Sequence, residues 1–163
     1  MSSAAEARFR IQSARSKPRS IKVIALDRPS EDVVRRLSEA SWSHATFFTA
    51  SSFAAAPSDR QHFVRQGWLS DLNGHICDLT DEVETADLVV MVATAGGTAE
   101  AASIIGEACS RSRVMTTALV VGGTSASDEA LSRTLAPLRP WSLMVVIASS
   151  DEYIEDMLTA LRA

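Results

Sequence analysis

Two segments of the chain combine an apolar run, a short polar loop and an amphipathic run, which is how α/β proteins build phosphate-binding loops. They are residues 21–40 and 87–112. In such loops, glycines let backbone N–H groups approach an anion closely at the start of a helix. The first loop has no glycine, whereas the second keeps Gly96 and Gly97. The sequence therefore predicts the architecture of a phosphate-binding domain with part of its chemistry missing.

The candidate ligand-binding residues follow two predicted strands. Loops at the carboxyl ends of parallel strands form the rim where doubly wound sheets bind ligands. A small anion, or the phosphate of a larger ligand, fits a Gly-Gly turn of this kind. Two adjacent glycines also allow a tight strand-to-helix turn that needs no ligand, and both interpretations stay open. The predicted ligand-binding residues are Thr94, Gly96, Gly97, Thr98, Gly122, Gly123 and Thr124.

The histidines and cysteines indicate little chemistry. His44, His62 and His75 have no partner at metal-ligand spacing, and Cys77 and Cys109 match neither a disulfide framework nor a zinc site. We therefore predict no metal site and no catalytic residue. His75 and Cys77 would share one face of a strand, so a Cys–His nucleophile remains an open alternative.

Predicted strands and helices alternate from residue 21 onward, and most of the strands are unbroken apolar runs. This pattern is typical of a parallel sheet whose two faces are both covered by helices. We predict a single α/β domain over residues 20–163, three-layered, doubly wound, mostly parallel and Rossmann-like. Strands are predicted at 21–26, 45–49, 76–79 (a short edge strand), 88–93, 114–121 and 143–148. Helices are predicted after an N-cap at Ser30 and over 61–72, 81–86, 99–111, 127–138 (capped by Ser125 or Ser127) and 151–162, with a loop at 50–60.

Charge and hydropathy limit the classes of partner. The net charge of −4 argues against general nucleic-acid binding by charge, and no apolar run is long enough to span a bilayer. The N-terminus lacks the apolar core of a signal peptide, so we expect a cytoplasmic protein. Residues 1–19 carry five basic side chains against Glu6 and are predicted to be a flexible basic arm. A solvated tail, a docking arm and a targeting peptide all fit this composition.

Three stretches resemble, in order, the N-terminal GTP-binding domain of FtsZ, the bacterial tubulin relative that assembles the division ring. IKVI followed by VVRRLSEA is similar to that family's first strand and helix, and ADLVVMVATAGG followed by AAxIIGEA to its signature loop and helix. LAPLRPWSLMVVIASSDEYI is similar to its later helix, strand and turn. The resemblance covers most of residues 21–163. It implies a tubulin-type nucleotide-binding fold, GTP or GDP as ligand, and assembly into oligomers.

The chain departs from the family at the positions that contact nucleotide. Residues 27–32 (DRPSED) replace a run of glycines with three acids and a proline, which repel phosphate and remove an amide donor. The signature loop is shortened to residues 94–100, and Glu100 opens the next helix where the family has glycine. Gly123 and Ser127 align with the family's ribose-binding Glu and Arg. The chain also stops before the loop that carries the family's catalytic aspartates, so we expect no hydrolysis by that mechanism.

The sequence therefore favours a non-enzyme: a degenerate, non-catalytic FtsZ/tubulin-like module that acts through self-association or partner binding. A small anionic ligand at the Gly96–Gly97 loop is compatible with this interpretation, and no cofactor is required. The alternative is a GTP-binding protein with weak or partner-dependent hydrolysis. Trp42, Trp68 and Trp141 lie near element ends and suit either the core or a subunit contact. A closed dimer is the expected assembly.

Overall fold

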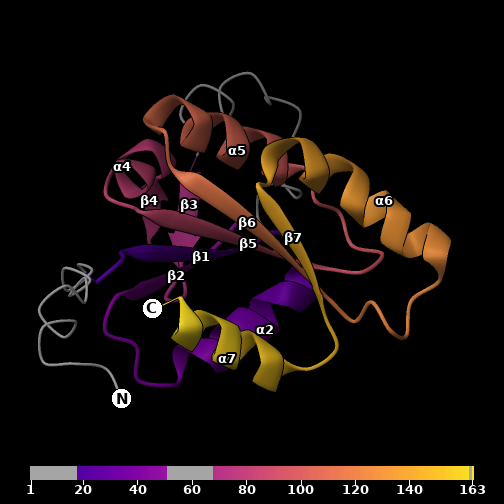
Figure 1. Cartoon of the computed structure of the whole chain (residues 1–163). Helices are drawn as coiled ribbons and strands as arrows, with labels where there is room; N and C mark the ends of the chain where they lie inside the picture. Colours follow the sequence, from indigo (N-terminus) through magenta and orange to yellow (C-terminus); the bar gives the residue numbers. More distant parts are fainter. Residues whose placement is uncertain (1–17, 51–67, 162) are drawn as a thin grey trace, which may run out of the picture.

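In the computed structural model, which describes residues 18–50, 68–161 and 163, the chain forms an α/β domain around one sheet. Seven strands of this part of the chain lie in the order β4-β3-β2-β1-β5-β6-β7 (Figure 1). Five of them are parallel, and β3 and β4 form an antiparallel hairpin at one end. The mostly parallel, Rossmann-like α/β prediction is confirmed. The strands are β1 (Ile21–Ala25), β2 (Ala45–Thr49), β3 (Trp68–Asp71), β4 (Ile76–Asp78), β5 (Leu88–Thr94), β6 (Met115–Val121) and β7 (Met144–Ala148).

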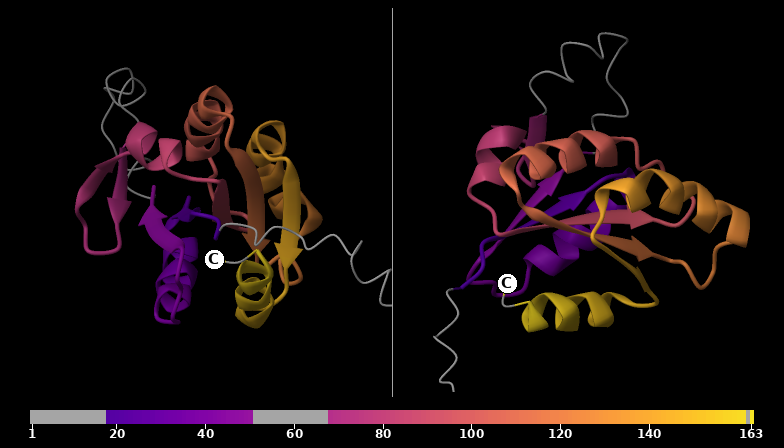
Figure 2. Two further views of the ribbon diagram at one scale, coloured as in Figure 1. Left: turned by 60° about the vertical axis from the view of Figure 1, so that its left-hand side comes forward. Right: turned by 45° about the horizontal axis from the view of Figure 1, so that its top comes forward.

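Helices cover both faces of the sheet and complete the three layers (Figures 1 and 2). On one face lie α2 (Arg28–Ser38) and α7 (Asp151–Ala160). On the other lie α4 (Leu79–Glu84), α5 (Ala101–Ser112) and α6 (Asp128–Leu138), which the 3-10 turn η2 (Arg139–Trp141) follows. Within the described residues, no helix is long and apolar enough to cross a membrane.

The core consists of two apolar clusters, one on each side of the sheet. Side chains of successive strand residues alternate between them: Ile24 and Val89 belong to the α4–α5–α6 side, Val23 and Val90 to the α2–α7 side. Because both faces are covered, the central strands are apolar at most positions, which is the pattern that predicted them; Thr116 and Thr117 of β6 are buried polar exceptions. Lys22 is the exception within β1.

The Lys22 side chain is almost buried and is compensated by charge. Its Nζ lies 2.8 Å from Glu82 Oε2 of α4 and 5.7 Å from the centre of the Phe48 ring. A buried ammonium requires such a partner, because an unpaired charge in the interior costs several kcal/mol. The pair ties β1 to α4.

The order of the parallel strands reverses between β1 and β5. From β1 the chain proceeds to β2 and the β3–β4 hairpin, then crosses back to place β5 on the other side of β1. In open α/β sheets, ligands bind beyond the carboxyl ends of the strands at such a switch point. The residues after Ala25 and around Thr94 therefore occupy the position where this fold holds a ligand.

The helix predicted over 61–72 is wrong at its C-terminal end, because residues 68–71 form β3. This strand pairs with β2 (Phe48 opposite Asp71) and with β4 (Leu69 opposite Cys77). The turn between β3 and β4 contains Gly74 at φ +87°, and an Asn-Gly pair is a strong hairpin signal. Residues 51–67, with most of the predicted loop and the rest of the predicted helix, lie outside the described residues.

Several predicted boundaries are corrected. Asp27, not Ser30, is the N-cap of α2, and Ser30 lies in its first turn. The helix predicted at 81–86 begins earlier, at Leu79, and the edge strand predicted at 76–79 is confirmed as β4. Of the two predicted caps of α6, Ser125 and Ser127, the structure has Ser127 as the N-cap. Residues 1–17 of the basic arm lie outside the described part of the chain.

Candidate functional site

Asp27 lies at the switch point, immediately beyond β1, where it caps α2. Its Oδ1 accepts a hydrogen bond from Ser30 N at 2.8 Å, and its own N–H donates to Ser30 Oγ at 3.2 Å. These reciprocal bonds form a capping box, which satisfies amides at the helix start that have no partner within the helix. Pro29 suits the first turn because its missing N–H is not needed there. The local sequence therefore directs a carboxylate to the helix N-terminus.

The same carboxylate also bridges to β5. Thr94 N donates to Asp27 Oδ2 at 2.8 Å, and Thr94 Oγ1 donates to Oδ1 at 3.1 Å. Asp27 is only 6% exposed, so these bonds are shielded from water. With Ser30 N, three donors from the first turn of α2 and the last residue of β5 converge on one negatively charged group. Backbone donors at a helix start bind phosphate in nucleotide-binding folds. In this chain, the Asp27 carboxylate accepts the hydrogen bonds of these donors instead.

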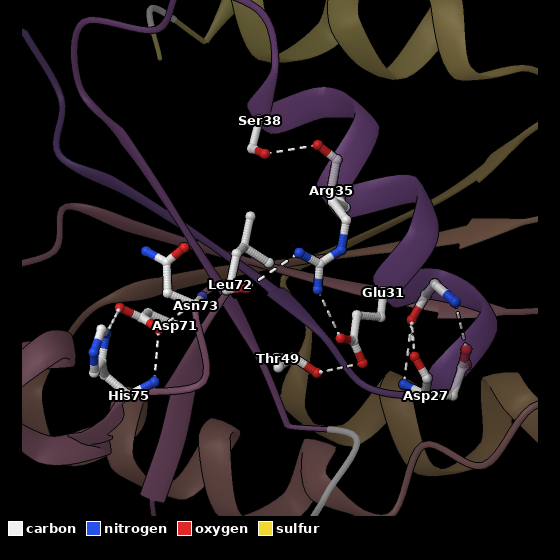
Figure 3. A network of polar contacts seen from close by, with 10 residues as sticks. Asp27, Glu31, Arg35, Ser38, Thr49, Asp71, Leu72, Asn73 and His75 are labelled. Carbon is white, nitrogen blue, oxygen red and sulfur yellow. Dashed lines mark hydrogen bonds and ion pairs between the residues drawn. The ribbon is translucent and has the colours of Figure 1, made fainter.

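Glu31, a second acid of the segment predicted as the first loop, lies further along α2, as Figure 3 shows. Glu31 Oε1 accepts from Arg35 at 3.2 Å, and Glu31 Oε2 lies 3.4 Å from Thr49 Oγ1 at the end of β2. Arg35 also donates to the Leu72 carbonyl at 3.1 Å and so links α2 to the β3–β4 hairpin. Carboxylates therefore line the carboxyl ends of both β1 and β2.

The amides of the Gly96–Gly97 turn are used within the protein. Gly96 N donates to Thr134 Oγ1 of α6 at 2.9 Å, and Gly97 N donates to the Thr94 carbonyl at 2.8 Å. Thr134 is fully buried, and its hydroxyl lies 3.2 Å from the Gly97 carbonyl oxygen. This threonine fastens α6 to the loop. Nothing in the sequence distinguishes it from other polar residues of the helix.

Backbone geometry accounts for both glycines of this turn. Gly96 has φ +87°, a left-handed conformation that glycine adopts without steric cost. At Gly97, a Cβ would lie 2.5 Å from Asp27 Oδ2 and 2.9 Å from the Thr94 carbonyl oxygen. The second glycine is therefore required by the buried carboxylate.

The second glycine loop follows β6 at the same edge of the sheet. Gly122 has φ +74°, and a Cβ on Gly123 would overlap the Ile147 side chain of β7. Because Thr94 pairs with Val121, the two loops are neighbours. The structure therefore brings the predicted residues Thr94, Gly96, Gly97, Thr98, Gly122, Gly123 and Thr124 to one rim. Binding of a ligand by them stays a prediction.

Two further predicted positions lie at the starts of helices. Glu100 occupies the N-cap position just before α5; it is exposed, and its side chain makes no capping hydrogen bond. Ser127 Oγ accepts from Ala130 N at 3.2 Å at the start of α6. Of these two residues, only Ser127 caps its helix through a side-chain hydrogen bond.

The Cys–His alternative gains no support from the geometry. His75 Nδ1 lies 3.0 Å from Asp71 Oδ2, in the hairpin turn, rather than against Cys77. Burial, with Glu82 and Asp71 nearby, raises the pKa of the Cys77 thiol, and burial raises the pKa of Cys109 to about 12. Both sulfurs are therefore protonated at neutral pH and are poor nucleophiles. Among the described residues, no group of three or more His, Cys, Asp or Glu side chains could hold a metal ion.

An open groove of about 430 Å³ lies at the opposite end of β6, away from the switch point. It is lined by Cys109 and Arg113 of the α5 end, Met115 of β6, and Trp141 and Leu143 after α6. Gly106 also lines the groove, and it packs so closely on Trp141 that a Cβ at this position would overlap the Trp141 side chain. The groove contains none of the predicted ligand-binding residues.

The sequence matches no protein-family model and no curated protein. Among solved structures, the fold is similar to translation elongation factor SelB from Methanococcus maripaludis in complex with the GTP analogue GppNHp. The TM-score is 0.51 at 8% sequence identity, and the match covers 89% of this chain and 34% of that one. The apo form of the same factor gives a TM-score of 0.48 at 10% identity, with coverages of 87% and 33%. The chain thus spans about a third of these proteins, and the likeness establishes an α/β fold alone.

Proposed function

We propose that this chain is a non-catalytic FtsZ/tubulin-like module that acts by binding protein, its nucleotide position being closed by its own Asp27 carboxylate. The tubulin-like assignment is supported by the sequence resemblance. The observation that carries the non-catalytic role is the convergence of Ser30 N, Thr94 N and Thr94 Oγ1 on Asp27.

The negative charge of Asp27 also repels a phosphate that approaches this position. Two unit charges about 4 Å apart repel by about 4 kcal/mol at the effective dielectric of a protein surface. Binding with millimolar affinity corresponds to about 4 kcal/mol in total. One fixed carboxylate next to a phosphate therefore cancels an affinity of that order, and the donors that would offset it are already occupied.

The alternative function is nucleotide binding at the same rim after Asp27 rotates away. It is supported by the two neighbouring glycine loops after β5 and β6, next to the switch point, and by the GTP analogue bound to the SelB protein that shares the fold. It requires the capping box and the bridge to Thr94 to break first. We therefore place it second.

A thermal-shift panel with GTP, GDP, ATP and inorganic phosphate, at millimolar concentration with Mg²⁺, distinguishes the two functions. The wild-type chain should show no shift with any of them. A ligand several times above its dissociation constant stabilises by about 1 kcal/mol or more, so a dose-dependent rise in Tm would contradict the proposal.

Two matched variants locate the effect. Asp27→Asn removes the charge and keeps the shape of the side chain. Asp78→Asn makes the same change at the N-cap of α4, where Asp78 accepts from Thr80 N at 2.7 Å, away from the switch point. We expect any phosphate response to appear only in Asp27→Asn.

A further inference from the structure

The sheet has two edges in the described part of the chain, and they differ in protection. In the left view of Figure 2, the β3–β4 hairpin and β7 lie at opposite ends of the sheet. β7 pairs with β6 on one side, and no described strand pairs with its other side. Such an edge presents backbone N–H and C=O groups that can template another strand.

The β4 edge has features that hinder pairing with another strand, whereas the β7 edge lacks them. β4 has three residues and ends at the charged Asp78. β7 has five residues, and residues 143–150 (LMVVIASS) contain neither a charge nor a proline. Leu143, Met144 and Ile147 are 78%, 45% and 47% exposed. Long, uncharged apolar edges are rare in monomers because they attract other strands.

The β7 edge is apolar on both faces of the sheet. Val145 packs against the cluster under α4, α5 and α6, and Ile147 lies over Gly123 on that side. Val146 packs against the cluster under α2 and α7. A strand added here would meet apolar side chains on both faces, so it must itself be apolar on both faces. β7 has this property.

We propose that a second copy of this chain pairs with β7 through its own β7, antiparallel about a two-fold axis, and so extends the sheet across the dimer. This inference specifies the partner left open by the proposed function and rests on it. Side-by-side pairing of one strand with its own copy about a two-fold must be antiparallel and isologous. Centred on Val146, it sets Val145 opposite Ile147 of the second copy and Met144 opposite Ala148.

The charges of α6 are complementary under this symmetry. Asp128 and Glu129 occupy its first turn, Arg133 follows, and Arg139 stands at its end; all four are exposed. α6 is the crossover between β6 and β7, so the two-fold sets it beside its copy with reversed direction. The acidic start of each helix then lies toward the basic end of the other, which favours this pairing over a parallel one.

The mass of the full chain in solution, measured by light scattering during size-exclusion chromatography, tests the proposal. The wild-type chain should elute as a dimer, at twice its 17.5 kDa. Ile147→Lys should give a monomer, because it sets a charge in the paired edge. Ile76→Lys makes the same change at a 77% exposed position on β4 and should remain a dimer. Circular dichroism checks that both variants fold.

A charge-swap pair tests the same interface without altering an apolar residue. Glu129→Arg or Arg139→Glu alone should weaken the dimer severalfold, and the two together should restore it. A monomeric wild type at roughly 100 μM, where moderate dimers persist, would overturn self-pairing and leave the edge to a different protein. A dimer indifferent to Ile147→Lys would overturn it as well.

The two proposals fail separately. A monomeric chain that shows no response to nucleotide would support the closed switch point and contradict pairing through β7. A dimer that GTP stabilises would support pairing through β7 and contradict the closed switch point.

Discussion

Replacing Asp27 with alanine should destabilise the protein more than the loss of an ordinary helix cap. The side chain accepts from Ser30 N and Thr94 N, each at 2.8 Å, and from Thr94 Oγ1 at 3.1 Å. Because Asp27 is 6% exposed, water replaces these bonds poorly. Alanine removes the acceptor and leaves the donors in place.

The cost follows from two contributions. Loss of an N-cap side chain costs about 1 kcal/mol. Leaving the partly buried Thr94 N–H without an acceptor costs up to about 1–3 kcal/mol more, the range for an unsatisfied buried donor. Asp27→Ala should therefore lower the free energy of unfolding by about 2–4 kcal/mol. Asp78→Ala, which removes an exposed cap from α4, should lower it by about 1 kcal/mol.

Equilibrium unfolding in urea, followed by circular dichroism, measures both losses. An unchanged slope of free energy against denaturant concentration shows that the unfolded state is not altered. Acetate or formate should restore part of the stability of Asp27→Ala by supplying the missing carboxylate, with no effect on Asp78→Ala. If Asp27→Ala loses no more than Asp78→Ala, the bridge to Thr94 contributes nothing and the reasoning about the switch point is wrong.

Three further predictions concern other parts of the core. Glu82→Gln should lower the free energy of unfolding by about 1–3 kcal/mol, and by more than Lys22→Met does, because it leaves the Lys22 ammonium, at 10% side-chain exposure, without its partner. Equal losses in denaturation curves of the two variants would count against this. Gly106→Ala should cost about 1–3 kcal/mol, because the new methyl group overlaps Trp141; a Tm equal to wild type would refute that contact. Burial raises the pKa of Cys109 from 9.0 to about 12, so its thiol should resist iodoacetamide at pH 9 until urea unfolds the chain. For the same reason, the free energy of unfolding should fall as pH rises from 9.0 toward 12, where the unfolded chain loses this proton first. Rapid alkylation of the folded chain would disprove the burial of Cys109.

The sequence predicted the central strands well because parallel strands covered on both faces are apolar at most positions. β2 begins and ends where the pattern placed it, and the apolar part of β5 was equally clear. β3 was missed because Trp68–Asp71 is short and follows residues with helical spacing. The Asn73-Gly74 pair was the available signal for its hairpin.

The chemistry of the switch point was only half predictable. That acids in the segment after β1 repel phosphate followed from residue types alone. That Asp27 itself accepts from Thr94, 67 positions away, depends on the adjacency of β1 and β5. The need for glycine at position 97 follows from the same contact. The hydrogen bond from Gly96 N to Thr134 likewise joins two loops that no local pattern connects.

The most direct test of the closed switch point is an NMR titration of the ¹⁵N-labelled chain with GTP and GDP. The amide signals of Ser30 and Thr94 report on the two backbone donors held by Asp27. We predict that neither signal moves at millimolar nucleotide with Mg²⁺. Saturable shifts of both, at a common dissociation constant, would show that nucleotide displaces the carboxylate and would contradict the account.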